Sequence, residues 1–299
     1  MKEVLRDSDL YNAAKDFIHS VWGSRNRDTF PGSHPISVEK RHFETLAKNE
    51  YVVCEKTDGT RYMLACFVHD GRKYSLFVNR NMTMYQVSLC VPSNTILDGE
   101  LVRMRNGDTV YMIFDGNIVN GVDVQRMNYI DRLKMTETAT KGPVAPNGIR
   151  ITNKTVWPKQ SVAHLDTLTF PYSTDGYIFT PVNEPVRMET HETMFKWKPL
   201  HEITVDFKVK RTGDGRYELF VWDRGSYTYE SDLVGGKPEH DGKIVECKFE
   251  DGRYWVPVKI RDDKPQPNNR RTFFRTMVNI RENITPNDFM NIWPRTQAQ

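Results

Sequence analysis

The sequence predicts an α+β fold in two domains, because helical and β-rich stretches occupy separate blocks of its 299 residues. From Tyr51 onward, short apolar runs are separated by Asp-Gly or Asn-Gly pairs, which are typical of hairpins between antiparallel strands. A second group of such runs follows Pro199. Several short strands in so small a span favour a small β-barrel, for which an OB-fold is one candidate.

Helices are expected mainly at the two ends of the chain. The first 50 residues are largely helical, and Ser37 can cap a helix that begins there. Strands are expected between residues 51 and 119, a helix over 123–142, and a strand pair within 176–199. The C-terminal residues return to helix, with Thr285-Pro286 as a helix start.

These blocks predict a domain boundary near residue 200. We expect residues 1–200 to form the first domain and residues 201–282 to form the barrel. A C-terminal helix at 283–299 is expected to pack back on the first domain.

Composition excludes several classes of protein. Hydrophobic residues make up 38% and charged residues 27%, which indicates an ordered globular protein rather than a disordered or collagen-like chain. No apolar run approaches the ~20 residues that span a bilayer, and no signal peptide is evident, so we expect an intracellular protein without a membrane partner. The net charge of +3 neither requires nor excludes nucleic acid. The four cysteines show no C-x-x-C pair, which argues against a cysteine zinc site.

Three of the eight Asp-Gly pairs stand beside residues that can carry chemistry, although the default interpretation of each is a turn. In Lys56-Thr57-Asp58-Gly59-Thr60-Arg61, a lysine ends an apolar strand near an arginine. A neighbouring cation lowers the pKa of an amine and makes it nucleophilic. In Asp98-Gly99-Glu100 the glutamate can contact a ribose hydroxyl, and in Thr174-Asp175-Gly176 the aspartate can hold a divalent metal beside a phosphate.

A fourth segment, Phe195-Lys196-Trp197-Lys198-Pro199, alternates so that both lysines point to one face of a strand. Two adjacent ammonium groups repel each other, which favours an anion between them. A solvated edge strand is the alternative.

Together with two further segments, these motifs resemble the ordered motif set of covalent nucleotidyltransferases, the superfamily of mRNA capping guanylyltransferases and nucleic-acid ligases. The further segments are Tyr111-Met112-Ile113-Phe114-Asp115 and Arg261-Asp262-Asp263-Lys264. The spellings K-T-D-G-x-R, K-W-K-P and R-x-D-K favour capping enzymes. The compact size is similar to the single-function guanylyltransferase of large DNA viruses of algae. The resemblance implies a ligase-type, ATP-grasp-like nucleotidyltransferase domain with antiparallel sheets, followed by a C-terminal OB-fold β-barrel.

The resemblance implies an mRNA 5′-capping GTP:RNA guanylyltransferase that acts in two steps. Lys56 attacks the α-phosphate of GTP, releases pyrophosphate and becomes a lysyl-N-GMP. The 5′-diphosphate end of an RNA then takes the GMP to give a GpppN cap. Mg²⁺ or Mn²⁺ is the implied cofactor. A separate RNA triphosphatase and cap methyltransferase are expected as partners, because the chain shows neither signature, and we expect a monomer.

The resemblance also assigns roles to individual residues. The implied catalytic group comprises Lys56, Arg61, Glu100, Asp175, Lys196 and Lys198, with Asp175 as the metal ligand. The implied GTP-binding group comprises Thr57, Arg80, Phe114, Lys154, Thr174, Arg261, Asp263 and Lys264.

Within these groups, Arg61 and Glu100 would meet the ribose, and Arg80 would lie near ribose or phosphate. Phe114 would stack on guanine, Lys154 would read its O6 atom, and Thr174 would reach the base. Lys196 and Lys198 would contact the α-phosphate. The motif at 261–264 would orient the β- and γ-phosphates when the OB domain closes.

Two other functions stay open at this stage. An ATP-dependent polynucleotide ligase shares the motifs and differs in the base that it uses. A catalytically silent OB-fold RNA-binding protein has no need of a nucleophile, so an intact Lys56 argues against it. We expect Trp157, Trp222 and Trp255 to serve packing of the core or barrel rather than base stacking.

Overall fold

The computed structural model describes residues 1–140 and 148–293, and the chain divides into two compact units, each with its own core. Unit 1 comprises residues 1–36, 44–196 and those from 289 onward, whereas unit 2 comprises residues 37–43 and 197–288. The predicted domains differ from these units at three segments: residues 37–43, 197–200 and 283–288 belong to unit 2.

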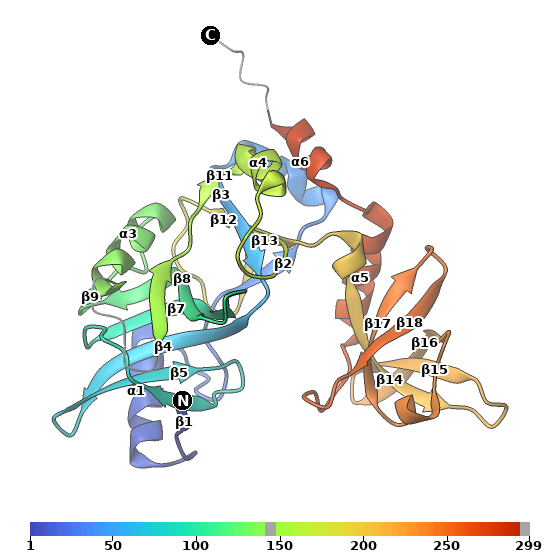
Figure 1. The fold of residues 1–299 in the computed structure, drawn as a ribbon, viewed down its shortest axis with the longest axis horizontal. Helices are drawn as coiled ribbons and strands as arrows, with labels where there is room; N and C mark the ends of the chain where they lie inside the picture. The colour runs from blue at the N-terminus through green and yellow to red at the C-terminus, as the bar shows by residue number, and fades with distance from the viewer. Residues whose placement is uncertain (141–147, 294–299) are drawn as a thin grey trace, which may run out of the picture. The chain divides into compact units, whose positions relative to one another are not determined.

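The larger sheet of unit 1 has eight strands (Figure 1). In spatial order they are β1 (Lys2–Glu3), β6 (Met84–Val87), β5 (Arg72–Val78), β4 (Thr60–His69), β7 (Thr95–Arg103), β8 (Thr109–Val119) and β10 (Ile149–Asn153), with β9 (Val122–Asp123) paired to β8. The pair of β8 and β10 is parallel, and the other pairs are antiparallel.

Helices cover both faces of this sheet. On β4, Met63 and Ala65 pack in one cluster with α1 (Asp9–Trp22), and Leu64 and Cys66 pack in another with the end of α3 (Tyr129–Thr140). Successive side chains of a strand point to opposite faces, so a strand that is covered on both sides is apolar throughout. This explains the uninterrupted apolar run in β4.

The second sheet of unit 1 has five strands. In spatial order they are β11 (Trp157–Pro158), β3 (Tyr51–Thr57), β12 (Thr174–Pro181), β13 (Thr190–Trp197) and β2 (His34–Ser37). Three short helices lie between or after these strands in the chain: α2 (Phe43–Lys48), α4 (Val162–Thr167) and α6 (Pro286–Ile292).

The prediction that Ser37 caps a helix is wrong: Ser37 ends β2, and Glu39 forms a capping box with His42 before α2.

Unit 2 contains a five-stranded antiparallel sheet in the order β16 (Ser226–Asp232), β15 (Tyr217–Asp223), β14 (Thr204–Arg211), β17 (Ile244–Glu250) and β18 (Tyr254–Ile260). Helix α5 (Arg270–Glu282) follows the last strand. The order is consistent with an OB-fold, but the predicted barrel is not closed by a full ladder. In the part of the chain that the structure describes, a single bridge between Leu233 and Trp255 connects the segment after β16 to β18.

The three tryptophans differ in burial, and Trp157 on β11 is only partly buried. Trp255 is 1% exposed and packs in the core of unit 2, as the sequence predicts. Trp222 is only partly buried, because its position on β15 alternates with the buried Leu219 and Val221. In the described part of the chain, no helix is both long and apolar enough to cross a membrane.

Candidate active site

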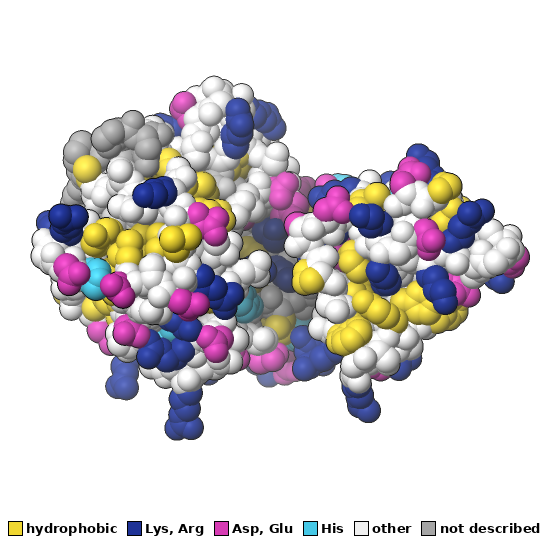
Figure 2. Space-filling model, turned by 90° about the horizontal axis from the view of Figure 1, so that it is seen from below, with side chains coloured by type: hydrophobic (Ala, Val, Ile, Leu, Met, Phe, Trp, Pro, Cys, Tyr) yellow, Lys and Arg dark blue, Asp and Glu magenta, His cyan; other side chains and the backbone are white. Residues whose placement is uncertain are grey.

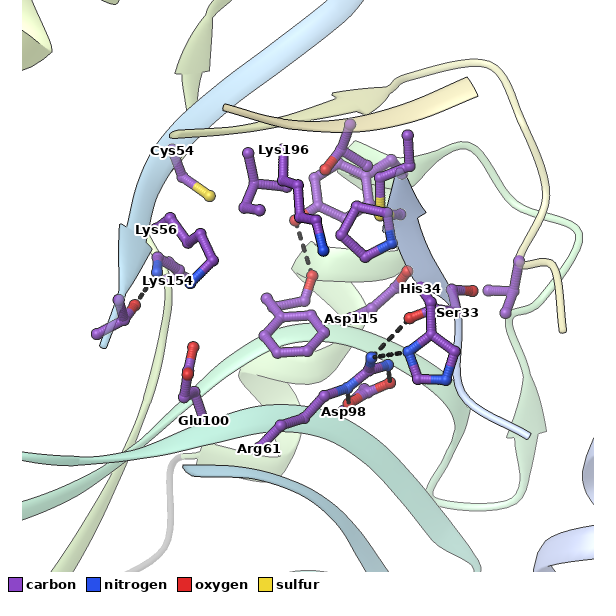
Figure 3. Close-up of a pocket in the computed structure, with 18 of the residues that line it drawn as sticks. Ser33, His34, Cys54, Lys56, Arg61, Asp98, Glu100, Asp115, Lys154 and Lys196 are labelled. Carbon is purple, nitrogen blue, oxygen red and sulfur yellow. Dashed lines mark hydrogen bonds and ion pairs between the residues drawn. The ribbon is translucent and has the colours of Figure 1, made fainter. Parts of the chain in front are cut away.

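Strands of both sheets of unit 1 line a pocket of about 220 Å³ (Figure 3). Most of the residues predicted from the sequence meet there. Those that line the pocket are Lys56, Thr57, Arg61, Arg80, Glu100, Phe114, Lys154 and Lys196.

Lys56 reaches the pocket from the end of β3, and its ammonium group pairs with a carboxylate. The distance from Lys56 Nζ to Asp175 Oδ1 is 2.6 Å. Asp175 lies in a β-bulge of β12, where Gly176 has a φ of +139°, a conformation that favours glycine. The bulge thus turns the carboxylate toward the neighbouring strand.

Arg61 is fixed on several sides, as Figure 3 shows. Its Nε donates to Asp98 Oδ1 at 2.9 Å, and its Nη1 donates to the Ser33 carbonyl oxygen at 2.6 Å. The guanidinium carbon lies 5.2 Å from the Phe30 ring centroid and 5.3 Å from that of Phe114. The cation that the sequence placed beside Lys56 is therefore neutralised by Asp98.

His34 adds a neutral acceptor to this arrangement. Burial lowers its pKa to about 4, with further lowering by the charges of Arg61, Arg80 and Lys196. The imidazole is therefore uncharged near neutral pH. Arginine can only donate, so Nδ1 of His34 accepts from Arg61 Nη1 at 3.2 Å.

Two other pocket residues have shifted pKa values. Burial raises the pKa of Glu100, although Lys154 and Lys56 oppose the shift. One Glu100 oxygen also accepts from the Gly59 backbone N–H at 3.2 Å. Burial, and next the charge of Arg61, lowers the pKa of Arg80.

Lys154 is almost fully buried beside β3. Its ammonium nitrogen donates to Thr57 Oγ1 and lies 3.4 Å from Glu55 Oε1. Glu55 is 2% exposed and also accepts from the Tyr172 hydroxyl at 2.9 Å. Thr57 therefore holds Lys154 within the pocket wall.

The backbone at Phe114 is positioned by a buried ion pair at the next residue and by a hydrogen bond to its carbonyl oxygen. Its neighbour Asp115 accepts from Arg132 of α3 at 2.8 Å and 3.0 Å, and Arg132 is 2% exposed. The Tyr129 hydroxyl donates to the Phe114 carbonyl oxygen at 2.7 Å. These contacts fix the strand that presents the Phe114 ring.

The predicted pair of lysines divides between the two units. Lys196 lines the pocket, and Phe195 and Trp197 are buried at 1% and 7% exposure, as the alternation predicts. Lys198 lies beyond the end of β13, in unit 2. Thr174 begins β12 opposite Thr57 but does not line the pocket.

The remaining predicted residues form an ion-pair cluster in unit 2. Arg261 donates to Asp263 at 2.9 Å and 2.8 Å and to Asp206 at 3.0 Å. Lys264 also donates to Asp206. The hydrogen bonds from Arg261 lower the pKa of Asp263 to about 2.

The Asp-Gly pairs separate into two groups of four. The turns are at Asp70-Gly71, Asp214-Gly215, Asp241-Gly242 and Asp251-Gly252. The others carry or adjoin pocket residues: Asp58-Gly59, Asp98-Gly99, Asp115-Gly116 and Asp175-Gly176. A Cβ at Gly99 would lie 2.6 Å from the Tyr111 ring, so the close strand approach there requires glycine.

Sequence reasoning missed Asp98, His34 and Phe30 as site residues. Asp98 stands in a motif that was singled out for its glutamate, and a second carboxylate two residues away on the same strand face was a usable signal. His34 and Phe30 lie in the loop and strand before residue 37 and carry no local motif.

The comparison with known proteins decides the family. The family model for the catalytic domain of mRNA capping enzymes matches residues 2–200, and the model for their C-terminal domain matches residues 178–290. The chain belongs to the mRNA capping enzyme family. Its activity is that of an mRNA guanylyltransferase, a nucleotidyltransferase.

Relatives named as mRNA capping enzymes come from fungi and vertebrates. The mRNA-capping enzyme subunit alpha of Schizosaccharomyces pombe is 26% identical, over 97% of this chain and 86% of that protein. The mRNA-capping enzyme of Mus musculus is 31% identical over 86% of this chain, and that of Danio rerio is 28% identical over 87%. The chain spans about half the length of these two vertebrate relatives, at 48% and 49%. The resemblance to the compact viral enzymes stays a prediction.

Among solved structures, a mycobacterial DNA ligase D complexed with ATP and MES aligns with 79% of this chain and 96% of that chain. The TM-score is 0.44 at 16% sequence identity.

Proposed function

We propose that Lys56 is the nucleophile of this guanylyltransferase and that the pocket of unit 1 binds GTP. The observation that carries the proposal is the Lys56 ammonium at the pocket wall, 2.6 Å from the Asp175 carboxylate. In the first step the deprotonated amine attacks the α-phosphorus. A P–N bond forms, the bond to the β-phosphate oxygen breaks, and pyrophosphate leaves. Asp175 is placed to accept the proton that the ammonium must lose.

Four pocket residues support recognition of guanosine. The Phe114 ring offers a stacking face, since Arg61 already covers it on one side. Lys154 has three N–H donors, of which Thr57 and Glu55 take two, so one remains for the guanine O6 atom. Arg61 and Glu100 would meet the ribose, as the sequence predicts.

Mg²⁺ or Mn²⁺ fits this site through Asp175. These cations are commonly held by one or two carboxylates together with substrate phosphates. Within residues 1–140 and 148–293 no group of three His, Cys, Asp or Glu side chains forms a metal cage, which agrees with a cation that depends on the nucleotide. When bound, the cation supplies charge neutralisation at the phosphates. Lys196 supplies a second positive charge from β13.

In the second step a β-phosphate oxygen of the 5′-diphosphate RNA attacks the phosphorus of the lysyl-GMP. The P–N bond breaks, and the lysine amine takes back a proton as the GpppN end leaves. Because this acceptor has two phosphates, a separate RNA triphosphatase must act before it. A cap methyltransferase acts afterwards, and we propose that the chain works as a monomer.

Labelling with α-³²P nucleotides tests the proposal. We expect the denatured chain to retain label from GTP with Mg²⁺ or Mn²⁺, and Lys56→Ala to retain none. The matched control is Lys73→Ala, which removes an exposed lysine of β5 and leaves labelling unchanged. Label from ATP instead of GTP would indicate the ligase alternative, and label on Lys56→Ala would exclude Lys56 as nucleophile. Release of label as a capped end on addition of 5′-diphosphate RNA tests the second step.

A further inference from the structure

Four aromatic side chains share the outer face of the unit 2 sheet. On β15, Phe220 and Trp222 alternate with the buried Leu219 and Val221, so they point away from the core. The register places Phe220 opposite Tyr229 and Trp222 opposite Tyr227. We call these four residues the aromatic face.

The two tyrosines of the aromatic face are exposed, Phe220 and Trp222 are partly buried, and the rings contact one another in pairs. Tyr227 is 44% and Tyr229 is 49% exposed. The rings of Trp222 and Tyr227 meet edge to face at 5.2 Å, and those of Phe220 and Tyr229 at 6.0 Å. Large exposed aromatics gathered on one sheet face are unusual for a surface that only meets water, and they indicate a binding site.

Positive charge lies beside the rings. Lys208 of β14 stands directly opposite Phe220 and donates to the carbonyl oxygen of Gly242 rather than to a carboxylate. Two residues along the same strand, Asp206 accepts from Arg261 and Lys264, which the sequence resemblance assigns to the GTP phosphates. At about 3.3 Å per residue and 4.8 Å between strands, this cluster lies on the order of 10 Å from the aromatic face. Figure 2 shows exposed hydrophobic side chains among Lys and Arg on unit 2.

We propose that the aromatic face binds the first nucleotides of the acceptor RNA as a single strand. The outer face of the second and third strands is where OB-folds bind oligonucleotides, and here these strands are β15 and β16. Unpaired bases stack on aromatic side chains regardless of sequence, which suits an enzyme that caps many different transcripts. The inference rests on the proposed function for its choice of RNA as occupant.

Nearby acidic groups make stacking rather than phosphate contact the main source of affinity. Arg270 is already paired with Glu230 at 2.9 Å, and Glu218 stands opposite Lys210. Each phosphate contact contributes about −0.7 to the slope of log K against log salt for a single strand. We therefore expect a slope between about −1 and −2, well below that of a protein that binds RNA through a basic groove.

Direct binding tests this inference independently of catalysis. Fluorescence anisotropy is measured with a labelled, unstructured RNA of about ten nucleotides and a 5′-hydroxyl end. We expect the double variant Tyr227→Ala with Tyr229→Ala to bind about 10- to 100-fold more weakly, since stacking contributes about 1–3 kcal/mol per base. The matched control, Tyr227→Phe with Tyr229→Phe, keeps both rings and should bind as wild type. Val258→Ala removes an equally exposed apolar side chain of β18 and should also bind as wild type.

Transfer from isolated lysyl-GMP protein provides the second measurement. The half-saturating concentration is compared for a 5′-diphosphate RNA and for ADP, which has the same phosphates and no following nucleotides. We expect the double alanine variant to lose the preference for RNA that wild type shows. Equal RNA binding by the alanine variant and wild type would overturn the inference and leave the face to another partner, as would an equal defect in the phenylalanine variant. A wild-type chain that binds RNA through these rings but takes no label from GTP would instead refute the proposed function alone.

Discussion

At the scale of single residues, Asp98 decides whether Arg61 can serve the pocket. The Asp98 carboxylate is 5% exposed and pairs with Arg61, whose side chain is 9% exposed. Water therefore cannot solvate either charge well if the other is removed. We expect Asp98→Asn to lower the free energy of unfolding by about 3 kcal/mol, because removing one partner of a buried pair leaves the other uncompensated. The KM for GTP should rise at least tenfold as Arg61 loses its fixed position.

Denaturant unfolding and the KM of the labelling reaction measure the two effects of Asp98→Asn. Asp108→Asn is the matched control, because the Asp108 carboxylate is 52% exposed and its contact with Arg150 is surface-exposed. Such a pair contributes at most about 1 kcal/mol. Equal stability of the two variants would show that Asp98 does not hold Arg61 as described.

His34 makes the stability of unit 1 depend on pH. The folded chain keeps His34 uncharged down to about pH 4, whereas the unfolded chain protonates it near 6.5. Between these values the unfolded state binds more protons, so the free energy of unfolding falls as the pH is lowered from 6.5 towards 4. Because His34 is partly exposed, we expect a loss of about 1–2 kcal/mol from this group. His34→Asn should flatten the profile over this range, and an unchanged profile would contradict the assignment.

The residue types of the site could be predicted from local sequence, whereas the ion-pair partners of those residues could not. The alternation of Phe195, Lys196 and Trp197 follows from strand geometry and is seen in their burial. The partner of Lys56, in contrast, lies 119 residues away, and that of Arg61 lies 37 residues away. No spacing rule connects such positions. The sequence therefore predicts that Arg61 lies beside Lys56, whereas in the fold Arg61 forms an ion pair with Asp98.

At the scale of elements, glycine determines how closely β7 approaches β8. A Cβ at Gly99 would lie 2.6 Å from the Tyr111 ring and 2.7 Å from the Met112 carbonyl oxygen. We expect Gly99→Ala to lower the free energy of unfolding by about 1–3 kcal/mol, because a packed core has no room for the added group. Gly213→Ala is the control, since no atom lies within 4 Å of a Cβ there. Thermal unfolding compares the two, and equal effects would contradict this account of β7.

Lys159 caps the C-terminal end of α2 by donating to three backbone carbonyl oxygens, two in the last turn and one just after it. The acceptors are Leu46 at 2.6 Å, Ala47 at 3.0 Å and Asn49 at 2.7 Å, and the ammonium also lies 4.9 Å from the Trp293 ring centroid. We expect Lys159→Met to lower the free energy of unfolding by about 3 kcal/mol, because it leaves buried acceptors unpaired. Lys48→Met, on the exposed face of the same helix, should cost less than about 1 kcal/mol. Denaturant unfolding is the measurement, and equal losses would show that Lys159 does not terminate α2.

Element types were easier to predict than the partners of each element. The strands of unit 2 follow from alternating runs between turns. The predicted closure of the barrel is not a full ladder: among the described residues, one bridge between Leu233 and Trp255 joins its open side. Asp58-Gly59 resembles a hairpin turn by composition, yet it links β3 to β4 in different sheets. Whether β3 and β4 form a hairpin or belong to different sheets depends on which elements cover the apolar faces of these two strands. Those elements come from distant parts of the chain.

At the scale of the whole molecule, the proposed reaction divides its work between the two units. Unit 1 holds the proposed nucleophile and the proposed GTP pocket, whereas Arg261 and Lys264 belong to unit 2 and pair with Asp206. If Arg261 binds the GTP phosphates, as the sequence resemblance implies, those phosphates must replace its ion pairs with Asp206 and Asp263. Replacing a carboxylate by a phosphate as the partner of an arginine costs little free energy, because the arginine keeps an anionic partner throughout. Such an exchange suits a residue that acts during only part of the catalytic cycle.

This division predicts that Arg261 affects the two steps unequally. We expect Arg261→Ala to slow formation of lysyl-GMP by about 100-fold, since it removes a positive charge from the β- and γ-phosphates in the transition state. Once pyrophosphate has left, those phosphates are gone, so isolated lysyl-GMP protein of this variant should transfer GMP to 5′-diphosphate RNA at nearly the wild-type rate. Arg261→Lys should recover part of the first step, and Arg253→Ala, which removes an exposed arginine of the same unit, should affect neither. Rapid-quench measurement of each step separates these outcomes. An equal loss in both steps would mean that Arg261 stabilises unit 2 rather than acting on the leaving pyrophosphate.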